Sequence, residues 1–288
     1  MEKKNLTLRP GKPEDAHPCA LICYEAFTTI SNQHNFPPDF TSPEETINWF
    51  PHILSNQNVY SVIAENNGEI VGSNFLWMHG EIAAVGPITV APNMQNDSVG
   101  RRLMENVLEY AKLKGFISVR LLQAGYHNRS LALYTKLGFN VREPLVVIQG
   151  DALNLKIPGY QVRSCTQDDI DACNQLCFQV HGCTREQELL EAIQQLTATV
   201  VVHDGNITGY ASVVGYFGHA VGKSNEDLKA LIGAATSFVG PGFILPMRNR
   251  ELFQWCLEKG LRVVAPVNLM TIGLYNEPVG AFLPSIFY

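Results

Sequence analysis

The 288-residue sequence predicts an α/β fold, with strands and helices arranged in two similar domains. Its length is sufficient for two domains of ordinary size. In the first half, segments with alternating apolar residues are interspersed with segments whose apolar residues recur every three or four positions, the periods of strands and helices. The second half repeats residue patterns of the first half at fixed offsets, as expected for two copies of one fold.

Composition and charge exclude several classes of protein. With 46% hydrophobic and 17% charged residues, the chain is typical of globular proteins. A net charge of −6 without a basic block argues against a nucleic-acid partner. No apolar run approaches the roughly 18 residues that span a bilayer, and no apolar signal core follows residues 1–5. Seven cysteines without a Cys-x-x-Cys pair suit a reducing compartment, so we expect a cytoplasmic protein without membrane contact.

The first elements are a strand and two helices. Residues Leu6 to Arg9 alternate as a strand, and Pro13 with two following acids opens a helix. A second helix is expected from Ser42 and Pro43, an N-cap residue followed by proline. The segment 31–40 between them has no periodicity and two prolines, which predicts a loop. Four of its side chains are candidates for binding an acceptor substrate, although a plain connector is an equal alternative: His34, Phe36, Asp39 and Phe40.

A β-hairpin and a third strand come next. Residues 59–65 and 69–77 flank Asn66-Asn67-Gly68, a strong turn signal. Residues 81–90 are predicted to form the next strand, which Pro92 ends because proline cannot donate to a ladder. From Val99 the apolar spacing becomes helical, and Gly115 is expected to close this helix.

The loop between this strand and the helix has the shape of a phosphate-binding turn. Unpaired N–H groups and the positive end of the helix dipole converge at the first turn of a helix. Gly100 would let a ligand approach the backbone, and Arg101 and Arg102 add positive charge. An ordinary strand-to-helix turn with the same residues remains an alternative.

This loop resembles the coenzyme A loop of the GNAT acetyltransferases, whose pattern is Gln/Arg-x-x-Gly-x-Gly/Ala. Gln95 and Gly100 match the pattern, whereas Ser98 stands where the family has its first glycine. Ser98 or Asp97 could instead cap the helix. The resemblance implies that the cofactor is contacted by Gln95, Ser98, Val99, Gly100, Arg101 and Arg102.

A second signature of the same family follows one strand later. Asn128, Tyr134 and the pair Gly138-Phe139 match its Asn…Tyr-x-x-x-Gly-Phe pattern. The resemblance implies a mixed, mostly antiparallel central sheet flanked by helices. It also implies that Tyr134 gives a proton to the leaving thiolate, that Asn128 contacts the cofactor arm and that the Val90 N–H faces the thioester oxygen. A helix in which Tyr134 only fills the core is the alternative.

The resemblance implies an N-acetyltransferase that moves an acetyl group from acetyl-coenzyme A to a primary amine by direct attack. The acceptor would be a small molecule or a peptide. We interpret Glu81, at the start of the cofactor strand, as the general base, with His79 and His127 as the other candidates. A non-catalytic acyl-coenzyme A sensor or scaffold, or an enzyme for a longer acyl chain, are the rival functions. A homodimer is left open.

The second half repeats the first. Three patterns of the first half, Leu8-Arg9, Glu14-Asp15 and Cys19/Cys23, recur at an offset of 154 as Val162-Arg163, Asp168-Asp169 and Cys173/Cys177. The hairpin pattern of residues 63–72 recurs at an offset of 137 as residues 200–209. We predict a catalytic domain over 1–150, a linker over 151–159 and a degenerate copy over 160–288.

The second copy is predicted to have lost the chemistry. Residues 240–249 stand where we expect the coenzyme A loop, without the Gln-x-x-Gly-x-Gly pattern, and the helix over 225–235 has no obvious counterpart in the first copy. Residues 256–264 are interpreted as the end of the long helix and its strand. Cys173, Cys177 and His181 share one helix face, near Cys183, but core packing is favoured and we predict no metal.

Overall fold

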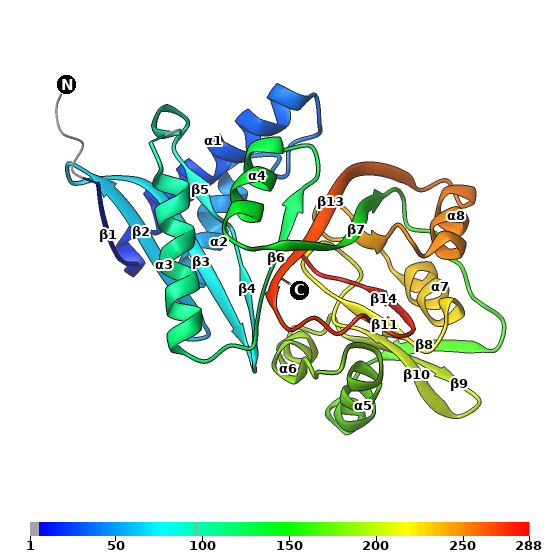
Figure 1. Ribbon diagram of the computed structural model, residues 1–288. Coiled ribbons are helices and arrows are strands. Elements are labelled where there is room, and N and C mark those ends of the chain that lie inside the picture. Colours follow the sequence, from blue (N-terminus) through cyan, green and yellow to red (C-terminus); the bar gives the residue numbers. More distant parts are fainter. Residues whose placement is uncertain (1–5, 96, 288) are drawn as a thin grey trace. The chain divides into compact units, whose positions relative to one another are not determined.

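The computed structural model describes residues 6–95 and 97–287, so the interpretation of the N-terminal residues 1–5 lies outside the described residues. The chain forms two compact units (Figure 1). The first unit comprises the described residues up to Asn140 together with 270–274 and Phe287, and the second comprises 141–269 and 275–286. The units therefore do not divide at residue 150. The expected linker 151–159 lies inside the second unit, where the Leu155 N–H donates to Gly233 O at 2.8 Å.

The first unit contains one sheet with helices on both of its faces. In chain order its elements are β1 (Leu6–Pro10), α1 (Ala16–His34), α2 (Pro43–Ser55), β2 (Val59–Asn66), β3 (Glu69–His79), β4 (Ile82–Val85), β5 (Thr89–Val90), α3 (Val99–Leu113), β6 (Ser118–Ala124) and α4 (Asn128–Lys136). The strand order is β1-β2-β3-β4-β6, β5 pairs with β3, and the β4–β6 pair is parallel while the other named pairs are antiparallel. The predicted mixed, mostly antiparallel sheet is confirmed.

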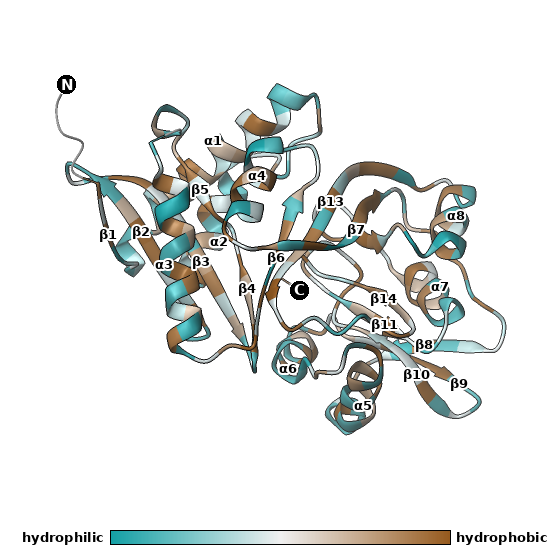
Figure 2. Ribbon diagram, in the orientation of Figure 1, coloured by the Kyte–Doolittle hydropathy of each residue, from teal (hydrophilic) through white to brown (hydrophobic). Residues whose placement is uncertain are grey.

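Alternate residues of β2 show how the two faces are covered. Val62 packs in the cluster that contains the buried side of α3, and Ile63 packs in the cluster formed by α1 and α2. Hydrophilic and hydrophobic residues alternate around α3 (Figure 2), and the apolar residues Leu103, Val107 and Ala111 on one side of it are buried. The amphipathic pattern therefore fixes which side of α3 rests on the sheet.

Two elements differ from the sequence prediction. The expected strand 81–90 is divided into β4 and β5, because Gly86 and Pro87 interrupt it. The helix α1 continues through the first residues of the expected loop and ends at His34, where Asn35 has a φ of 57°. The acceptor loop is therefore shorter than predicted and begins at Asn35.

The second unit repeats the order of elements of the first with two differences. Its elements are β8 (Tyr160–Ser164), α5 (Ile170–His181), α6 (Glu186–Gln194), β9 (Thr199–His203), β10 (Asn206–Ala211), β11 (Ala220–Gly222), α7 (Asn225–Ala234), β12 (Phe243–Pro246), α8 (Arg250–Glu258), β13 (Arg262–Gly273) and β14 (Ala281–Leu283). The differences are that the single strand β11 precedes its third helix and that one further strand, β14, follows at its end. One sheet has the order β14-β11-β10-β9-β8, and β7 (Asn140–Gln149) lies between β12 and β13. Strand β13 serves both units, since its residues from Met270 on belong to the first.

The two units share interactions as well as element order. Arg9 holds Asp15 through two bonds of 2.6 and 2.8 Å, and Arg163 holds Asp169 through two bonds of 2.7 and 2.8 Å. The β2–β3 and β9–β10 hairpins turn on Asn67 and Asp204, which have φ angles of 52° and 49°. Each hairpin carries one register shift, at positions 137 residues apart. The predicted offsets therefore hold in the backbone.

This correspondence corrects two alignments of the second half. Helix α7 follows β11 as α3 follows β5, so the helix that lacked a counterpart corresponds to α3. Residues 240–249 contain β12 and correspond to the strand β6, while α8 and β13 correspond to α4 and β7. Residues 223–224, between β11 and α7, stand where the first unit has its candidate cofactor loop.

Candidate active site

The candidate site begins where two parallel strands separate. β4 pairs with β6 from the pair Ile82–Ser118 to the pair Ala84–Arg120. Beyond this point the chain leaves β6, and its next strand, β5, pairs with β3. Val90 lies opposite Gly72, and the Ala91 N–H donates to Val71 O at 2.9 Å. Hydrogen-bonded and non-hydrogen-bonded pairs alternate in an antiparallel ladder. The N–H and C=O of Val90 therefore point away from β3, where a ligand atom can meet them.

The first turn of α3 offers further backbone donors. The first intrahelical bond at this end runs from the Arg102 N–H to Ser98 O at 3.0 Å. The N–H groups of Val99, Gly100 and Arg101 precede it and project from the end of the helix. Ser98 is the N-cap residue, but its side chain accepts no capping bond and its φ is 62°. The family glycine at this position is thus replaced by a residue in the left-handed region.

Three elements meet around Gly100. A Cβ at this position would contact Val90 Cγ2 at 3.7 Å and Leu133 Cδ2 at 3.8 Å. These are ordinary van der Waals distances, so packing within the chain does not require glycine here. They also place the start of α3 beside β5 and beside the turn of α4 that carries Tyr134.

The polar side chains of the loop have different partners. Gln95 Oε1 accepts from Arg129 Nη1 at 3.3 Å, and Gln95 Nε2 donates to Val90 O at 3.5 Å. Gln95 therefore joins the loop to β5 and α4. Arg102 instead donates to Leu6 O at 2.9 Å, and the exposed Arg101 pairs with Glu105 at 3.5 Å. The structure does not bring these two guanidinium groups to Gln95.

Tyr134 lies in the core cluster of α3 and α4. Its side chain is 8% exposed, and its ring centroid lies 6.0 Å from that of Phe139. Burial raises the pKa of the phenol above its ordinary value of about 10, so the hydroxyl is protonated at neutral pH. Asn128 is exposed and is the first residue of α4, with His127 at the N-cap.

Glu81 is far from these residues. It is exposed in the turn between β3 and β4, and its C=O accepts from the Ile117 N–H at 3.0 Å. Val90 lies opposite Gly72 on β3. Gly72 precedes Gly80, at the turn of the hairpin, by eight residues. At about 3.3 Å per residue, Glu81 is roughly 25 Å from Val90. The structure therefore places the expected general base at the opposite end of the hairpin.

The acceptor loop contacts the segment that precedes α4. The Phe36 ring stacks on Tyr126 with centroids 4.1 Å apart, and the His34 ring lies 5.5 Å from Tyr126 and 6.2 Å from His127. Tyr126 was not predicted as a site residue, although its position after β6 and before α4 was a signal. Phe40 faces elsewhere, since its ring lies 5.7 Å from Phe27 in the α1–α2 cluster.

Two ionisable groups of this region have shifted pKa values. Burial, with Arg129 and His34 nearby, lowers the pKa of His127 to about 4, so its imidazole is neutral at pH 7. Burial raises the pKa of Asp39 to about 6. The acceptor loop thus carries a carboxylate that titrates near neutral pH.

The corresponding helix start in the second unit is closed by its own residues. Asp227 is 1% exposed and accepts from the N–H and hydroxyl of Ser224, both at 2.9 Å, and from Thr208 Oγ1. A Cβ at Gly222 would lie 2.8 Å from the Asp227 Cβ. A buried carboxylate at the first turn repels an anionic ligand, which agrees with the predicted loss of a cofactor site.

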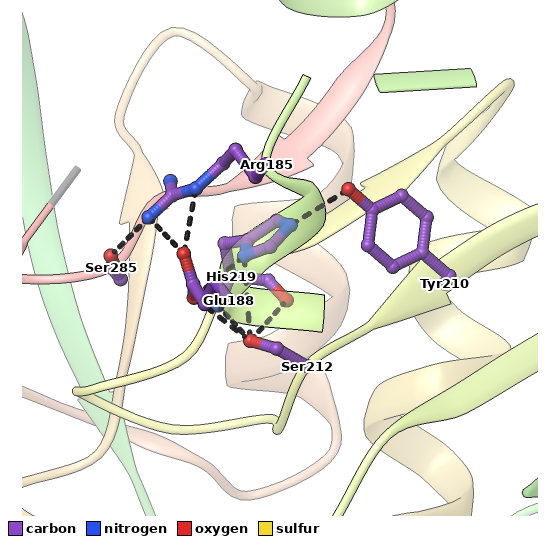
Figure 3. A network of polar contacts seen from close by, with 6 residues as sticks. All are labelled: Arg185, Glu188, Tyr210, Ser212, His219 and Ser285. Carbon is purple, nitrogen blue, oxygen red and sulfur yellow. Dashed lines mark hydrogen bonds and ion pairs between the residues drawn. The ribbon is translucent and has the colours of Figure 1, made fainter. Parts of the chain in front are cut away.

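A polar network also lies in the second unit (Figure 3). Glu188 Oε1 accepts from His219 Nδ1 at 2.8 Å, and Tyr210 OH donates to His219 Nε2 at 2.8 Å. Arg185 pairs with Glu188 at 2.5 Å and donates to Ser285 Oγ at 3.0 Å. Because these groups bond to one another, we interpret the network as structural.

Cysteines of the second unit are packed in its core. Cys173 and Cys177 lie in a hydrophobic cluster of the second unit, and the His181 ring packs against Phe282. Over residues 6–95 and 97–287, no group of three His, Cys, Asp or Glu residues could hold a metal. Over the same residues, every helix is too short or too polar to cross a bilayer.

Comparison with known proteins decides the family. The model of the acetyltransferase (GNAT) family matches residues 24–139. An IAA acetyltransferase from Azospirillum brasilense is 30% identical over 105 residues, which are 35% of this chain and 68% of that protein. The chain belongs to the GNAT acetyltransferase family.

Further relatives agree with this GNAT assignment. A mycothiol acetyltransferase from Amycolatopsis mediterranei is 28% identical over 149 residues, 48% of this chain and 46% of its own length. A Pyrococcus horikoshii protein assigned as an acetyltransferase has a TM-score of 0.76 at 17% identity, with 98% of this chain and 94% of that chain covered. A GCN5-related N-acetyltransferase from Sphaerobacter thermophilus has a TM-score of 0.63 at 15% identity, covering 96% and 97%. Both structures share the GNAT fold over nearly the whole chain.

Proposed function

We propose that the first unit is an N-acetyltransferase that transfers the acetyl group of acetyl-coenzyme A to a primary amine by direct attack. Membership of the GNAT family supports an acyltransferase. The observation that carries the proposal is the meeting of β5, α3 and α4 around Gly100. This meeting puts an outward-facing Val90 N–H, the free donors of a helix start and the Tyr134-bearing helix at one edge of the sheet.

Each part has a role in this proposal. The N–H groups of Val99, Gly100 and Arg101 bind the pyrophosphate of the cofactor, with the positive end of the α3 dipole behind them. Gln95 and Arg129 border the same loop. The Val90 N–H donates to the thioester carbonyl oxygen, and the bond strengthens as negative charge develops on that oxygen.

Tyr134 acts at the leaving group. The amine nitrogen forms a bond to the carbonyl carbon, and the carbon–sulfur bond breaks. The thiolate, whose conjugate acid has a pKa of about 8.5 when free, takes the proton of Tyr134, and the proton that the attacking nitrogen loses to solvent restores the phenol. The raised pKa keeps this proton on the phenol until the sulfur leaves.

Turnover and binding together test the proposal. Purified protein is titrated with acetyl-coenzyme A by calorimetry, and free thiol is then measured with a panel of aliphatic, aromatic and peptide amines. We expect one equivalent of cofactor to bind and thiol to be released with at least one amine. Tyr134→Phe removes only the hydroxyl, so kcat should fall about 100-fold or more while the Kd for acetyl-coenzyme A changes less than twofold.

The other outcomes point to the rival functions. If acetyl-coenzyme A does not bind, the acetyltransferase proposal is wrong. If it binds without amine-dependent thiol release, a sensor of acyl-coenzyme A is the better explanation. Competition among acyl-coenzyme A esters of increasing chain length then shows whether a longer acyl group is preferred.

A further inference from the structure

Two aromatic rings from distant parts of the chain stack at the end of β6. Phe36 follows α1, and Tyr126 is the second residue after β6. Their ring centroids lie 4.1 Å apart, and their planes differ by 11°. Ligands of α/β proteins bind at the carboxyl ends of parallel strands, where neighbouring strands diverge. β4 and β6 are such a pair, so the two rings lie at the edge of the sheet that holds the proposed reaction centre.

These rings are reached from the side of the sheet opposite the cofactor helix. α3 and Tyr134 pack in one hydrophobic cluster, and α1 packs in the cluster on the other face. The cofactor proposed at the start of α3 therefore leaves the α1 side to the second substrate. His34, the last residue of α1, has its ring 5.5 Å from that of Tyr126. The acceptor thus approaches along the end of α1.

Two hydroxyl groups in the last turns of α1 are buried without a partner. Among residues 6–95 and 97–287, nothing forms a hydrogen bond with Thr28 Oγ1 or Ser31 Oγ, and both atoms are shielded from solvent. Residues three apart lie on the same side of a helix. Ser31 is joined to the ring pair, because its C=O accepts from the Phe36 N–H at 2.9 Å. Burying an unpaired hydroxyl is costly, and a ligand that bonds to it offsets this cost.

We propose that the acceptor is a primary amine joined by a short flexible chain to a hydroxylated aromatic ring. The ring takes the place of Phe36 against Tyr126, and its hydroxyl group bonds to Ser31 and Thr28. The amine then extends toward Tyr134. This inference rests on the proposed function and names the class of its acceptor.

The length of the acceptor follows from α4. Asn128 is the first residue of this helix, and Tyr134 lies six residues further on. At about 1.5 Å per residue, Tyr134 is roughly 9 Å from Asn128 along the helix axis. Tyr126 precedes Asn128 by two residues. A ring held at Tyr126 therefore needs a chain of a few atoms to bring the amine to the thioester.

Phe36 is the ring of the pair that can move. It lies between Asn35, whose φ is 57°, and two prolines, outside any helix or strand. Tyr126 instead lies in a closed turn between β6 and α4, in which the His127 N–H donates to Ala124 O at 2.8 Å. Rotation of the Phe36 side chain requires no change of backbone hydrogen bonds. The acceptor ring replaces the stacking contact that Phe36 gives up, so the exchange costs little.

The surroundings favour a hydroxyl over an ionised substituent. A serine or threonine hydroxyl offers one donor and accepts at two positions, and a ring hydroxyl is complementary to both roles. Burial, with Arg129 and His34 nearby, lowers the pKa of His127 to about 4, so this ring is neutral at pH 7. Burial also raises the pKa of Tyr126, which keeps the phenol protonated. An ionised group on the acceptor would lose hydration here without gaining an opposite charge from these two side chains.

Two amines that differ only in the ring hydroxyl test the acceptor class: tyramine and 2-phenylethylamine. In wild type, kcat/KM for tyramine should exceed that for 2-phenylethylamine at least tenfold. Ser31→Ala should lower the tyramine value about tenfold and Thr28→Val about threefold, with the 2-phenylethylamine value within twofold of wild type in both. Thr29→Val, a neighbouring substitution on α1, is the matched control and should keep the preference for tyramine.

Substitutions of the two rings should have opposite effects. Tyr126→Leu removes the surface on which the acceptor ring stacks, so KM for both aromatic amines should rise about tenfold. KM for 3-methylbutylamine, which has no ring, should stay within twofold. Phe36→Ala removes the competing ring, so KM for the aromatic amines should fall about threefold. A purely structural role of both rings would shift these KM values in the same direction. An unchanged Kd for acetyl-coenzyme A reports that each variant is folded.

The outcomes separate this inference from the proposed function. If wild type does not bind acetyl-coenzyme A, or binds it without thiol release with any amine, the proposed function fails and this inference with it. If wild type acetylates amines without preferring tyramine, or if Ser31→Ala and Thr28→Val keep that preference, the acceptor class is wrong and the acetyltransferase stands. If Phe36→Ala raises KM as Tyr126→Leu does, the acceptor ring does not replace Phe36, and the inferred binding mode is wrong.

Discussion

The starts of α3 and α7 occupy corresponding places in the two units but present opposite chemistry. Each helix follows a strand paired with a glycine of the preceding hairpin, Gly72 in the first unit and Gly209 in the second. Eight residues, 91–98, lead into α3, whereas only Lys223 and Ser224 lead into α7. The longer connection leaves N–H groups facing outward, and the shorter one is closed by Asp227.

Both helix starts attract negative charge, because the dipole and the unpaired N–H groups are the same in each. In α7 the negative charge comes from the chain itself, through the capping box of Ser224 and Asp227. In α3 the side chain of the N-cap residue Ser98 makes no capping bond, and the proposed ligand supplies the charge. One physical property of helices therefore stabilises the fold in one unit and is available for binding in the other.

The acceptor sides differ in the same way. The loop before α2 holds Asp39 without an ion-pair partner among the residues described. At the corresponding helix of the second unit, α6, Glu188 is bonded to Arg185 and His219. In the second unit Glu188 is thus paired with side chains of the same unit, while in the first unit Asp39 has no such ion pair among the described residues.

The largest effect is expected when the start of α3 is made to resemble that of α7. Gly100→Asp places a carboxylate in the first turn, where it favours the helix but repels a pyrophosphate. We expect the Kd for acetyl-coenzyme A to rise about a thousandfold by calorimetry, with the melting temperature preserved. Gly100→Ala, whose Cβ fits, should weaken binding only about tenfold. Equal affinities for both variants would contradict the electrostatic explanation.

The converse change opens the start of α7. Asp227→Ala removes the acceptor for Ser224 and Thr208, so the free energy of unfolding should fall by about 3 kcal/mol in denaturant titrations. Asp227→Asn, which keeps one acceptor oxygen, should lose less stability than Asp227→Ala. The stoichiometry of acetyl-coenzyme A should remain one, because the two-residue connection cannot surround a pyrophosphate. A second equivalent bound by Asp227→Ala would show that the carboxylate alone blocks the site.

The internal pairing of the second unit has a pH dependence. Burial lowers the pKa of His219 in the folded protein, although Glu188 opposes this. The unfolded chain therefore binds more protons below about pH 6.5, and stability should fall as the pH drops through that value. His219→Gln should lower the free energy of unfolding by about 2 kcal/mol at pH 8. Its further decrease in stability between pH 8 and pH 5 should be smaller than that of wild type. Identical pH slopes for wild type and variant would assign the dependence to other groups.

The smallest effect concerns Ser98. Its left-handed conformation is unfavourable for a side chain, so Ser98→Gly should raise the free energy of unfolding by about 1 kcal/mol. Thermal melts of wild type, Ser98→Gly and Ser98→Ala provide the measurement. The alanine variant should show no gain in stability over wild type. A loss of stability in Ser98→Gly would mean that the serine hydroxyl stabilises this turn.

Elements with a local signal could be predicted from the sequence. The amphipathic stripe of α3 and the Asn67-Gly68 turn each depend on neighbouring residues, and both appear in the structure where expected. The family signatures placed Gly100 and Tyr134, and the structure brings their helices together. The offset of the hairpins was visible because both copies kept the same turn chemistry.

Positions set by tertiary pairing were not predictable in the same way. Glu81 starts the predicted strand, but only the pairing of β3 with β4 and β5 shows how far it lies from Val90. Helix α7 was not recognised as the counterpart of α3, because a six-residue shortening of its loop removed the sequence pattern. Phe36 and Tyr126 stack across ninety residues of chain, and nothing local indicates that contact.

Strand β13 has a consequence for the synthesis of the protein. The first unit includes 270–274, and the Leu274 N–H donates to Ile117 O at 2.9 Å, beside β6. This part of the chain is made about 130 residues after α4, roughly 7 to 26 s later at ordinary translation rates. Until then the edge of β6 lacks its neighbour, so the first unit cannot be completed on the ribosome before the second has been made. Expression of a fragment ending near residue 150 should therefore give an unstable, aggregation-prone product.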